Sequence, residues 1–329
     1  MLKELTRKAR DLVAAKLRHL PVSSRVAGPP KGSYESFEEY SRATRDPLAK
    51  EWPVLAAESQ TLVPPATLAS DELGMFQPVD YRSPGFSVFR ISHGRFHRDA
   101  RALLTCDDRI LTPFSAVMGS GSDDNWLFRK LALGTLTRVR GKALLLVGNR
   151  NYYHFLIEEL PRVWLVRQAG FDLGAFDHIL MFSPLHESQR TLCTRIGIDP
   201  KRIVPLENVP HVESKELFFA TPPWHYGATY LKMARALNLG LSSPSSIAPM
   251  KRIYVSRERC THGKITNGDE LIAELTRLDF EKVTPEMLSF DDQVALFGQA
   301  EVIIGAHGAG PDRSDFLEAG MQGRGDSQS

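Results

Sequence analysis

The chain has 329 residues, 42% of them hydrophobic and 24% charged, which is ordinary for a folded protein with a large core. Its 41 basic and 39 acidic residues leave a formal net charge of +2. Neutralising nucleic-acid phosphates takes a clustered excess of basic residues, so this balance argues against a nucleic-acid partner. The cysteines match no disulfide or metal spacing, and no apolar run reaches the roughly 18 residues of a membrane span. We therefore expect a cytoplasmic protein with reduced cysteines and no bound metal.

Residues 1–20 follow an amphipathic helical pattern that ends before Pro21. Apolar residues such as Leu5 and Leu12 recur at helical spacing, and basic residues such as Lys3 occupy the other faces. Charges interrupt the pattern too often for a signal peptide. Two interpretations stay open: the helix packs on its own protein or a partner, or it makes peripheral contact with an anionic membrane surface.

The rest of residues 1–80, after this helical pattern, is expected to be a proline-rich arm with short elements. Each proline removes a backbone donor and restricts the residue before it. Residues 86–111 alternate β-branched and aromatic residues with polar ones, which predicts antiparallel strands. In that interpretation His93–Gly94 and Asp107–Asp108 lie in turns.

From residue 142 onward, short apolar runs alternate with helical patterns, which predicts a doubly wound α/β arrangement. The expected strands are 142–148, 177–184, 202–207 and 214–223, and the expected helices are 151–170, 187–198 and 229–241. The serine- and proline-rich segment 242–250 is the best candidate for a linker. A second unit follows, with strands at 251–257, 280–285 and 301–310 and helices at 267–278 and 289–300, the latter capped by Ser289.

Three polar residues lie one helical turn apart after the 142–148 strand. His154, Glu158 and Arg162 are spaced by four, so they share one face of the helix. Pro161 is expected to free the carbonyl of Ile157 and to kink this helix. An open α/β sheet binds its ligands at the carboxyl ends of its strands, which makes this face a candidate active site. The alternative is an ordinary exposed face with a Glu158–Arg162 ion pair.

Two further stretches follow strands of the second unit. Arg257, Lys264 and Asn267 lie between a strand and a helix N-terminus, where charge-assisted hydrogen bonds and the helix dipole suit a diphosphate. A solvated basic loop is the alternative. The run GAHGAG at 305–310 follows an apolar strand, and its glycines let a ligand approach the backbone closely. Its glycine spacing differs from the dinucleotide-binding fingerprint, so a dinucleotide cofactor is not expected.

Taken in order, these stretches resemble glycosyltransferase family 61, which includes bacterial capsular and surface-polysaccharide proteins. The resemblance covers residues 142–310 and rests on NYYHFLIEELPR, on IYVSR with its basic loop and NGDEL, on PEMLSFDDQV and on IIGAHGAG. Gly268 stands where the family usually has an acidic residue.

The resemblance implies a GT-B fold, in which two Rossmann-like domains face each other across a cleft. We expect an acceptor-side domain at 81–241 and a donor-side domain at 251–310. Family members transfer a sugar with inversion and without an essential metal, from a nucleotide-sugar donor to a glycan or glycolipid acceptor. For this chain the resemblance implies surface-polysaccharide biosynthesis, with a UDP-sugar as the expected donor and no separate cofactor.

Family motifs assign roles to particular residues of this chain. The catalytic helix carries His154, Glu158 and Arg162, and the choice of base stays open between His154 and Glu158. The residues matched to donor binding are Arg257, Lys264, Asn267, Glu270, His307, Gly308 and Gly310.

The chain departs from the family after Gly310. Members continue with Leu-Thr-Asn and a further apolar strand, whereas residues 311–329 are polar and resemble a disordered tail. A one-base shift with permitted codons reads Gly-Leu-Thr-Asp-Leu-Ile-Phe-Leu-Lys-Pro, so we hypothesise a frameshift that leaves the second domain incomplete. The competing functional hypothesis is a truncated, non-catalytic remnant of a transferase. A nucleotide-binding protein of another class has little support, because the sequence contains no P-loop.

Overall fold

The computed structural model describes residues 28–62, 79–115, 125–147, 152–184, 187–222, 228–248, 250–258 and 265–306. A nine-stranded sheet and a three-stranded sheet organise most of these residues. The predicted helix at 1–20 and the tail at 311–329 lie outside the described residues. No helix of the described residues is long and apolar enough to cross a membrane.

Four parallel strands form one half of the nine-stranded sheet. They are β8 (Thr137–Leu145), β9 (His178–Met181), β10 (Ile203–Pro205) and β11 (His211–Ala220), in the spatial order β10-β9-β8-β11. When the four strands are numbered along the chain, their order across the sheet is 3-2-1-4, as in half of a Rossmann sheet. The order reverses between β8 and β11, so a ligand is expected beyond the carboxyl ends of these two strands.

Helices connect these strands as the sequence predicts. The segments α3 (Tyr152–His154), a π-helical turn (Phe155–Glu159) and α4 (Leu160–Gln168) follow β8, while α5 (Glu187–Arg195) follows β9 and α6 (Ala228–Leu241) follows β11. Their apolar residues pack on the sheet, where Leu144, Leu160, Val163, Ile179 and Phe218 are almost fully buried. The helices predicted at 151–170, 187–198 and 229–241 are therefore confirmed.

Residues 86–111 form antiparallel strands in the other half of the large sheet, which confirms the prediction for this segment. It contains β5 (Phe86–His97), β6 (Ala102–Leu104) and β7 (Arg109–Leu111). The turn predicted at His93–Gly94 is wrong, because β5 continues through it while pairing with β11. A Cβ at position 94 would lie 2.8 Å from the Cβ of Leu217, which explains why glycine stands there.

Short elements of the N-terminal arm extend this sheet. Strand β1 (Gly32–Tyr34) pairs with β7, helix α2 (Phe37–Thr44) follows, and β2 (Lys50–Leu55) pairs with β5. A separate hairpin joins β3 (Glu58–Leu62) to β4 (Val79–Ser83).

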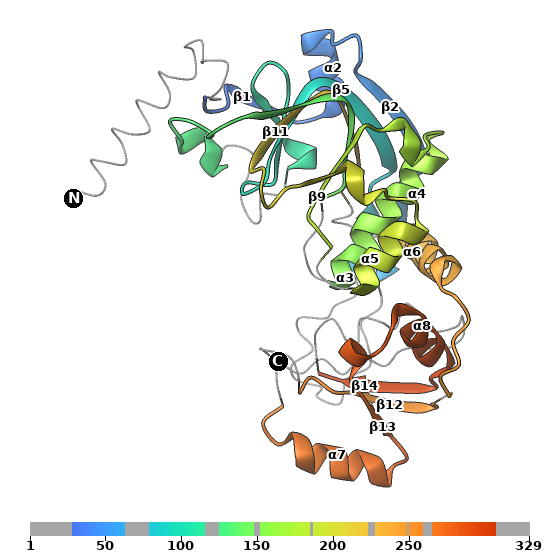
Figure 1. Ribbon diagram of the computed structural model, residues 1–329. Helices are drawn as coiled ribbons and strands as arrows, with labels where there is room; N and C mark the ends of the chain where they lie inside the picture. The colour runs from blue at the N-terminus through green and yellow to red at the C-terminus, as the bar shows by residue number, and fades with distance from the viewer. Residues whose placement is uncertain are drawn as a thin grey trace, which may run out of the picture.

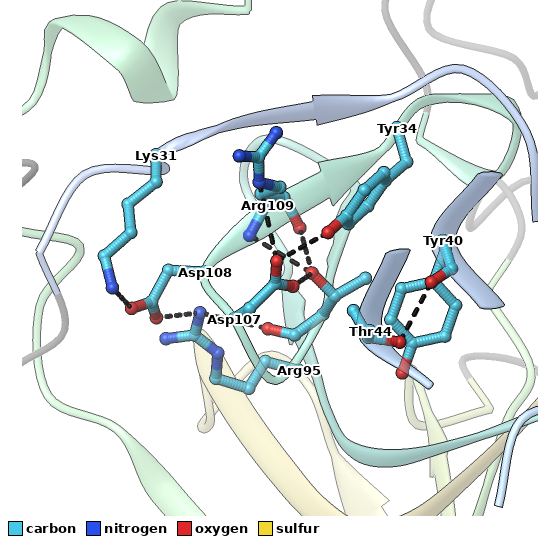
Figure 2. Close-up of polar contacts among 9 residues, drawn as sticks. Lys31, Tyr34, Tyr40, Thr44, Arg95, Asp107, Asp108 and Arg109 are labelled. Carbon is cyan, nitrogen blue, oxygen red and sulfur yellow. Dashed lines mark hydrogen bonds and ion pairs between the residues drawn. The ribbon is translucent and has the colours of Figure 1, made fainter. Parts of the chain in front are cut away.

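Asp107 and Asp108 lie in the turn between β6 and β7, as predicted, and fasten β1 to the sheet. The Tyr34 hydroxyl donates to Asp107 Oδ2 at 2.6 Å, and Lys31 Nζ lies 2.9 Å from Asp108 Oδ2 (Figure 2). The buried Arg95 donates through Nη2 to Asp108 Oδ1 at 2.6 Å. These contacts give the aspartate pair a structural role.

The three-stranded sheet is parallel and stands apart from the large one (Figure 1). Its strands are β12 (Arg252–Val255), β13 (Glu281–Val283) and β14 (Val302–Gly305), in the order β13-β12-β14, with helices α7 (Gly268–Arg277) and α8 (Phe290–Gln299). Ser289 Oγ accepts the Asp292 N–H at 3.1 Å, which confirms the predicted cap of α8. The described residues of the linker, 242–248 and 250, contain no regular element.

Candidate active site

The predicted catalytic helix begins beyond the carboxyl end of β8. His154 ends α3, Glu158 lies in the π-helical turn, and Arg162 lies in the first turn of α4. Nδ1 of His154 is hydrogen bonded to Oε1 of Glu158. The His154 side chain is 32% exposed and that of Glu158 only 10%, so the imidazole faces solvent with the carboxylate behind it.

Arg162 is 6% exposed and belongs to the interior of the site. Its Nη1 donates to the carbonyl of Val147, two residues beyond β8, and its Nε has no hydrogen-bond partner among the described residues. Because Glu158 and Arg162 are both buried, the alternative of an ordinary exposed face is wrong.

A small cavity lies where the strand order of the large sheet reverses. The residues that line it include Leu145 at the end of β8, Val147 just after it, Ala220 at the end of β11, and Glu158 and Arg162 from the helix. Its volume of about 50 Å³ suits roughly one or two water molecules and not a sugar. Glu158 and Arg162 therefore line a cavity at the position where an open α/β sheet is expected to bind a ligand.

A second cavity, of about 500 Å³, lies beside β12 and the N-terminus of α7. It brings together Arg257 and Asn267, which the sequence predicted for one site, and the family-matched Glu270. Asn267 flanks the first turn of α7 without a side-chain cap hydrogen bond. The predicted residues Lys264, His307, Gly308 and Gly310 lie outside the described residues.

Carboxylates that the sequence analysis did not single out also line this second cavity. Asp269 lies in the first turn of α7, and Glu258 follows Arg257 and forms an ion pair with Lys282 of β13. In the sequence, these carboxylates are marked only by being next to predicted site residues. The spacing of residues on a loop does not show which side chains face a cavity. The cavity thus offers both a guanidinium and hydrogen-bond acceptors.

The free cysteines are further candidate nucleophiles, and Cys193 lies in the core cluster that includes residues of the catalytic helix. Burial, and then the charge of Glu159, raises the pKa of the Cys193 thiol to about 12, so this buried cysteine stays protonated. Cys106 is also free, and Cys260 lies outside the described residues. Within the described ranges no group of three or more His, Cys, Asp or Glu is placed to hold a metal ion.

Together, these features define an α/β protein with polar cavities near the carboxyl ends of parallel strands in two sheets, which is where open α/β sheets bind their ligands. The sequence profile of the family described as Glycosyltransferase 61 matches residues 152–322, just over half of the chain. The chain therefore belongs to glycosyltransferase family 61, and membership implies glycosyltransferase activity on a donor and an acceptor. No curated protein sequence matches this chain.

Proposed function

We propose that this chain is an inverting, metal-independent glycosyltransferase of GT-B fold that moves a sugar from a nucleotide-sugar donor, a UDP-sugar in the first instance, to a glycan acceptor in surface-polysaccharide biosynthesis. Residues 81–241 would form the acceptor side and residues 251–310 the donor side. The observation that carries the proposal is the pairing of His154 with Glu158 at the point where the strand order of the large sheet reverses. A cavity that holds Arg257 lies beside the second sheet.

The pairing favours His154 as the base. The Glu158 carboxylate accepts a hydrogen bond from Nδ1 of His154 and holds the imidazole ring in place. This leaves Nε2 of His154 to take the proton of the acceptor hydroxyl. The acceptor oxygen then attacks the anomeric carbon from the face opposite the nucleoside diphosphate, whose bond to the sugar breaks. Glu158 stabilises the imidazolium that forms, and its low exposure makes it the weaker candidate for direct contact with an acceptor.

Arg257 would neutralise charge on the departing diphosphate, assisted by Lys264 and by the N-terminal dipole of α7. A carboxylate in the first turn of α7, Asp269 or Glu270, suits the ribose hydroxyls, since acidic residues bind ribose in other Rossmann-like sites. This division of labour needs no metal to balance the diphosphate charge.

The base assignment is tested by sugar transfer with His154→Ala, using UDP-sugars and an oligosaccharide acceptor mixture. We expect kcat to fall by roughly 10²- to 10⁴-fold with UDP affinity unchanged. His178→Ala, at the start of β9, is the matched control and keeps its activity. Proton NMR of the product reports inversion, and activity in EDTA reports metal independence. An active His154→Ala enzyme would exclude this residue as the base.

The donor site is tested by thermal unfolding with nucleoside diphosphates, beginning with UDP. A saturable rise in Tm is expected in the wild type and is lost in Arg257→Ala, because ligands that bind only the folded state stabilise it. Arg277→Ala, which removes an exposed arginine paired with Glu274 in the last turn of α7, keeps the rise. If no nucleotide raises the wild-type Tm, the donor assignment fails and the non-catalytic remnant becomes the better explanation.

A further inference from the structure

The helix that carries the candidate base contains a break in its backbone hydrogen bonding. Pro161 has no N–H, so the carbonyl of Ile157 loses its ordinary α-helical donor. The Leu160 N–H donates to the carbonyl of Phe155, five residues back, and this bypasses the carbonyl of Leu156. Two successive buried carbonyls therefore lack their usual helical partners, which costs free energy unless other donors reach them.

Side chains from α6 supply those donors. The Tyr230 hydroxyl donates to the Ile157 carbonyl at 2.8 Å, and Asn238 Nδ2 donates to the Leu156 carbonyl at 3.1 Å. Both side chains are 1% exposed, so water does not compete for these bonds. The residues are 73 and 82 positions away from their acceptors along the chain, so these bonds exist only in the folded protein.

Neighbouring contacts hold these two donors in place. The ring of Tyr230 stacks on Phe86 of β5, with centroids 4.5 Å apart, and Asn238 Nδ2 also donates to the Ala234 carbonyl at 2.9 Å. At the start of α6, Thr229 donates to Glu58 through its N–H at 2.9 Å and its hydroxyl at 2.6 Å. The position of α6 is thus fixed by strands of the arm and of the large sheet.

The π-helical turn sets where the charged residues of the site point. His154 precedes it, Glu158 lies within it and Arg162 comes after it, and one extra residue in a turn rotates the rest of the helix by roughly 100°. Burial raises the pKa of the Tyr230 phenol, and the nearby charges of Arg162 and Glu158 act on that pKa in opposite directions. The hydroxyl therefore stays protonated as a donor and lies within electrostatic reach of both charged residues.

We propose that Tyr230 and Asn238 are positioning residues of this enzyme, which hold the π-helical turn in the register that joins His154 to Glu158. They contact neither substrate, and they act through the backbone of Leu156 and Ile157. This inference rests on the proposed function only where catalysis is measured, because the His154–Glu158 contact can be observed in a protein without activity.

The test uses Tyr230→Phe, which removes one oxygen and keeps the stacked ring, and Asn238→Leu, which removes the amide. Tyr40→Phe is the matched control, because Tyr40 is also fully buried and donates its hydroxyl to Asp46 at 2.6 Å, away from the site. The ¹⁵N signals of the His154 ring, assigned by their loss in His154→Gln, report the hydrogen bond at Nδ1. Steady-state kinetics and the pH profile of kcat/KM report its effect on catalysis.

We expect both α6 variants to shift the His154 ring signals and to lower kcat by roughly 10- to 100-fold with the donor KM unchanged, as misplaced catalytic groups do. Tyr40→Phe is expected to lower Tm while leaving the ring signals and the pH profile as in the wild type. Unchanged ring signals in Tyr230→Phe and Asn238→Leu overturn the inference, as does an equal change in Tyr40→Phe. A wild-type protein without transferase activity would count against the proposed function alone, because the ring signals still test the positioning role.

Discussion

Two buried histidines lie opposite each other on neighbouring strands. His211 of β11 is fully buried and pairs in register with His97 of β5, their ring centroids 5.4 Å apart. Neither ring nitrogen of His211 has a hydrogen-bond partner among the described residues. Burial, and then the charges of Arg95 and His97, lowers the pKa of His211 to about 3. The His211 ring is therefore neutral in the folded protein at neutral pH.

This pair predicts a loss of stability in acid. The folded-state pKa of His211 lies below the unfolded value of 6.5, so the unfolded chain binds more protons at low pH. The stability contribution is complete above pH 6.5 and is lost as the pH falls toward about 3, at up to ~1.4 kcal/mol per pH unit. Urea unfolding between pH 7.5 and 4.5 should show a flatter pH dependence for His211→Leu than for the wild type.

His93→Gln is the control for that experiment, because the His93 side chain on β5 is 59% exposed and glutamine keeps a donor for the neighbouring Glu213. Its stability should follow the wild-type curve at every pH. Parallel curves for His211→Leu and the wild type would mean that another group governs acid unfolding.

At the residue scale, the sequence identified the polar residues within the catalytic helix but not the residues of another helix that contact it. The spacing of His154 and Glu158 predicted that they share one face of a helix, and the structure joins them by a hydrogen bond. It also predicted a free carbonyl at Ile157. Tyr230 and Asn238 escaped notice because their side chains resemble ordinary members of a helical pattern. The donor for a freed carbonyl depends on tertiary packing, which no local pattern encodes.

At the scale of the elements, the π-helical turn depends on a side chain of α6. The Tyr230 hydroxyl donates to the Ile157 carbonyl in place of the N–H that Pro161 lacks. Tyr230→Phe should lower the free energy of unfolding by about 1–3 kcal/mol, since it leaves the buried Ile157 carbonyl without its donor. Adding Pro161→Ala should recover part of that loss, because the new N–H at position 161 can donate to the same carbonyl. Chemical unfolding of the two single variants and the double variant measures this coupling.

Pro161→Ala alone serves as the reference in that cycle, because removing a proline also changes the unfolded chain. A coupling between positions 161 and 230 of about 0.5 kcal/mol or more is expected for groups that serve one acceptor. Strictly additive effects would show that the Ile157 carbonyl finds another donor.

Most strands and helices were predictable from the sequence because their apolar periods differ. The strand β12, predicted at 251–257, and the helix α8 with its Ser289 cap are examples in which pattern and structure agree. The turn expected at His93–Gly94 failed, because pairing with β11 favours a continuous β5 over the local preference of glycine for turns. The missed π-helical turn arises from a hydrogen-bond shift of one residue, which an apolar pattern does not record.

At the scale of the whole molecule, Arg195 and Asp291 form a clamp, an ion pair that joins a helix beside the large sheet to a helix beside the three-stranded sheet. Arg195 of α5 contacts both carboxylate oxygens of Asp291 in α8, at 2.5 and 2.7 Å, and also donates to the Leu241 carbonyl at 2.9 Å. Asp291 accepts the N–H of Ser243 in the linker at 2.7 Å. Figure 1 shows α5 facing α8 where the two units meet. One side-chain pair thus binds both units and the linker between them.

This clamp should contribute measurably to the coupling of the two units. Hydrogen bonds from Arg195, the largest effect, hold the pKa of Asp291 below its ordinary value of 3.8. Its stabilising contribution is therefore present above pH 3.8 and is lost as the pH falls through the lower folded-state value. A double-mutant cycle with Arg195→Ala and Asp291→Ala at pH 7 should give a coupling of about 1 kcal/mol, the upper end for partly exposed pairs, because both oxygens are engaged.

The matched control is the Glu187–Arg190 pair on the same helix, whose side chains are 80% and 53% exposed. Water and salt screen such a pair, so its cycle should give a coupling of no more than about 0.5 kcal/mol. In Asp291→Ala, hydrogen exchange of α8 and of residues 242–248 should quicken while that of β8 and β9 does not, since only the former depend on the clamp. Uniform quickening throughout the chain would mean that the clamp stabilises the whole fold, and unchanged exchange in α8 would mean that apolar packing alone joins the two units.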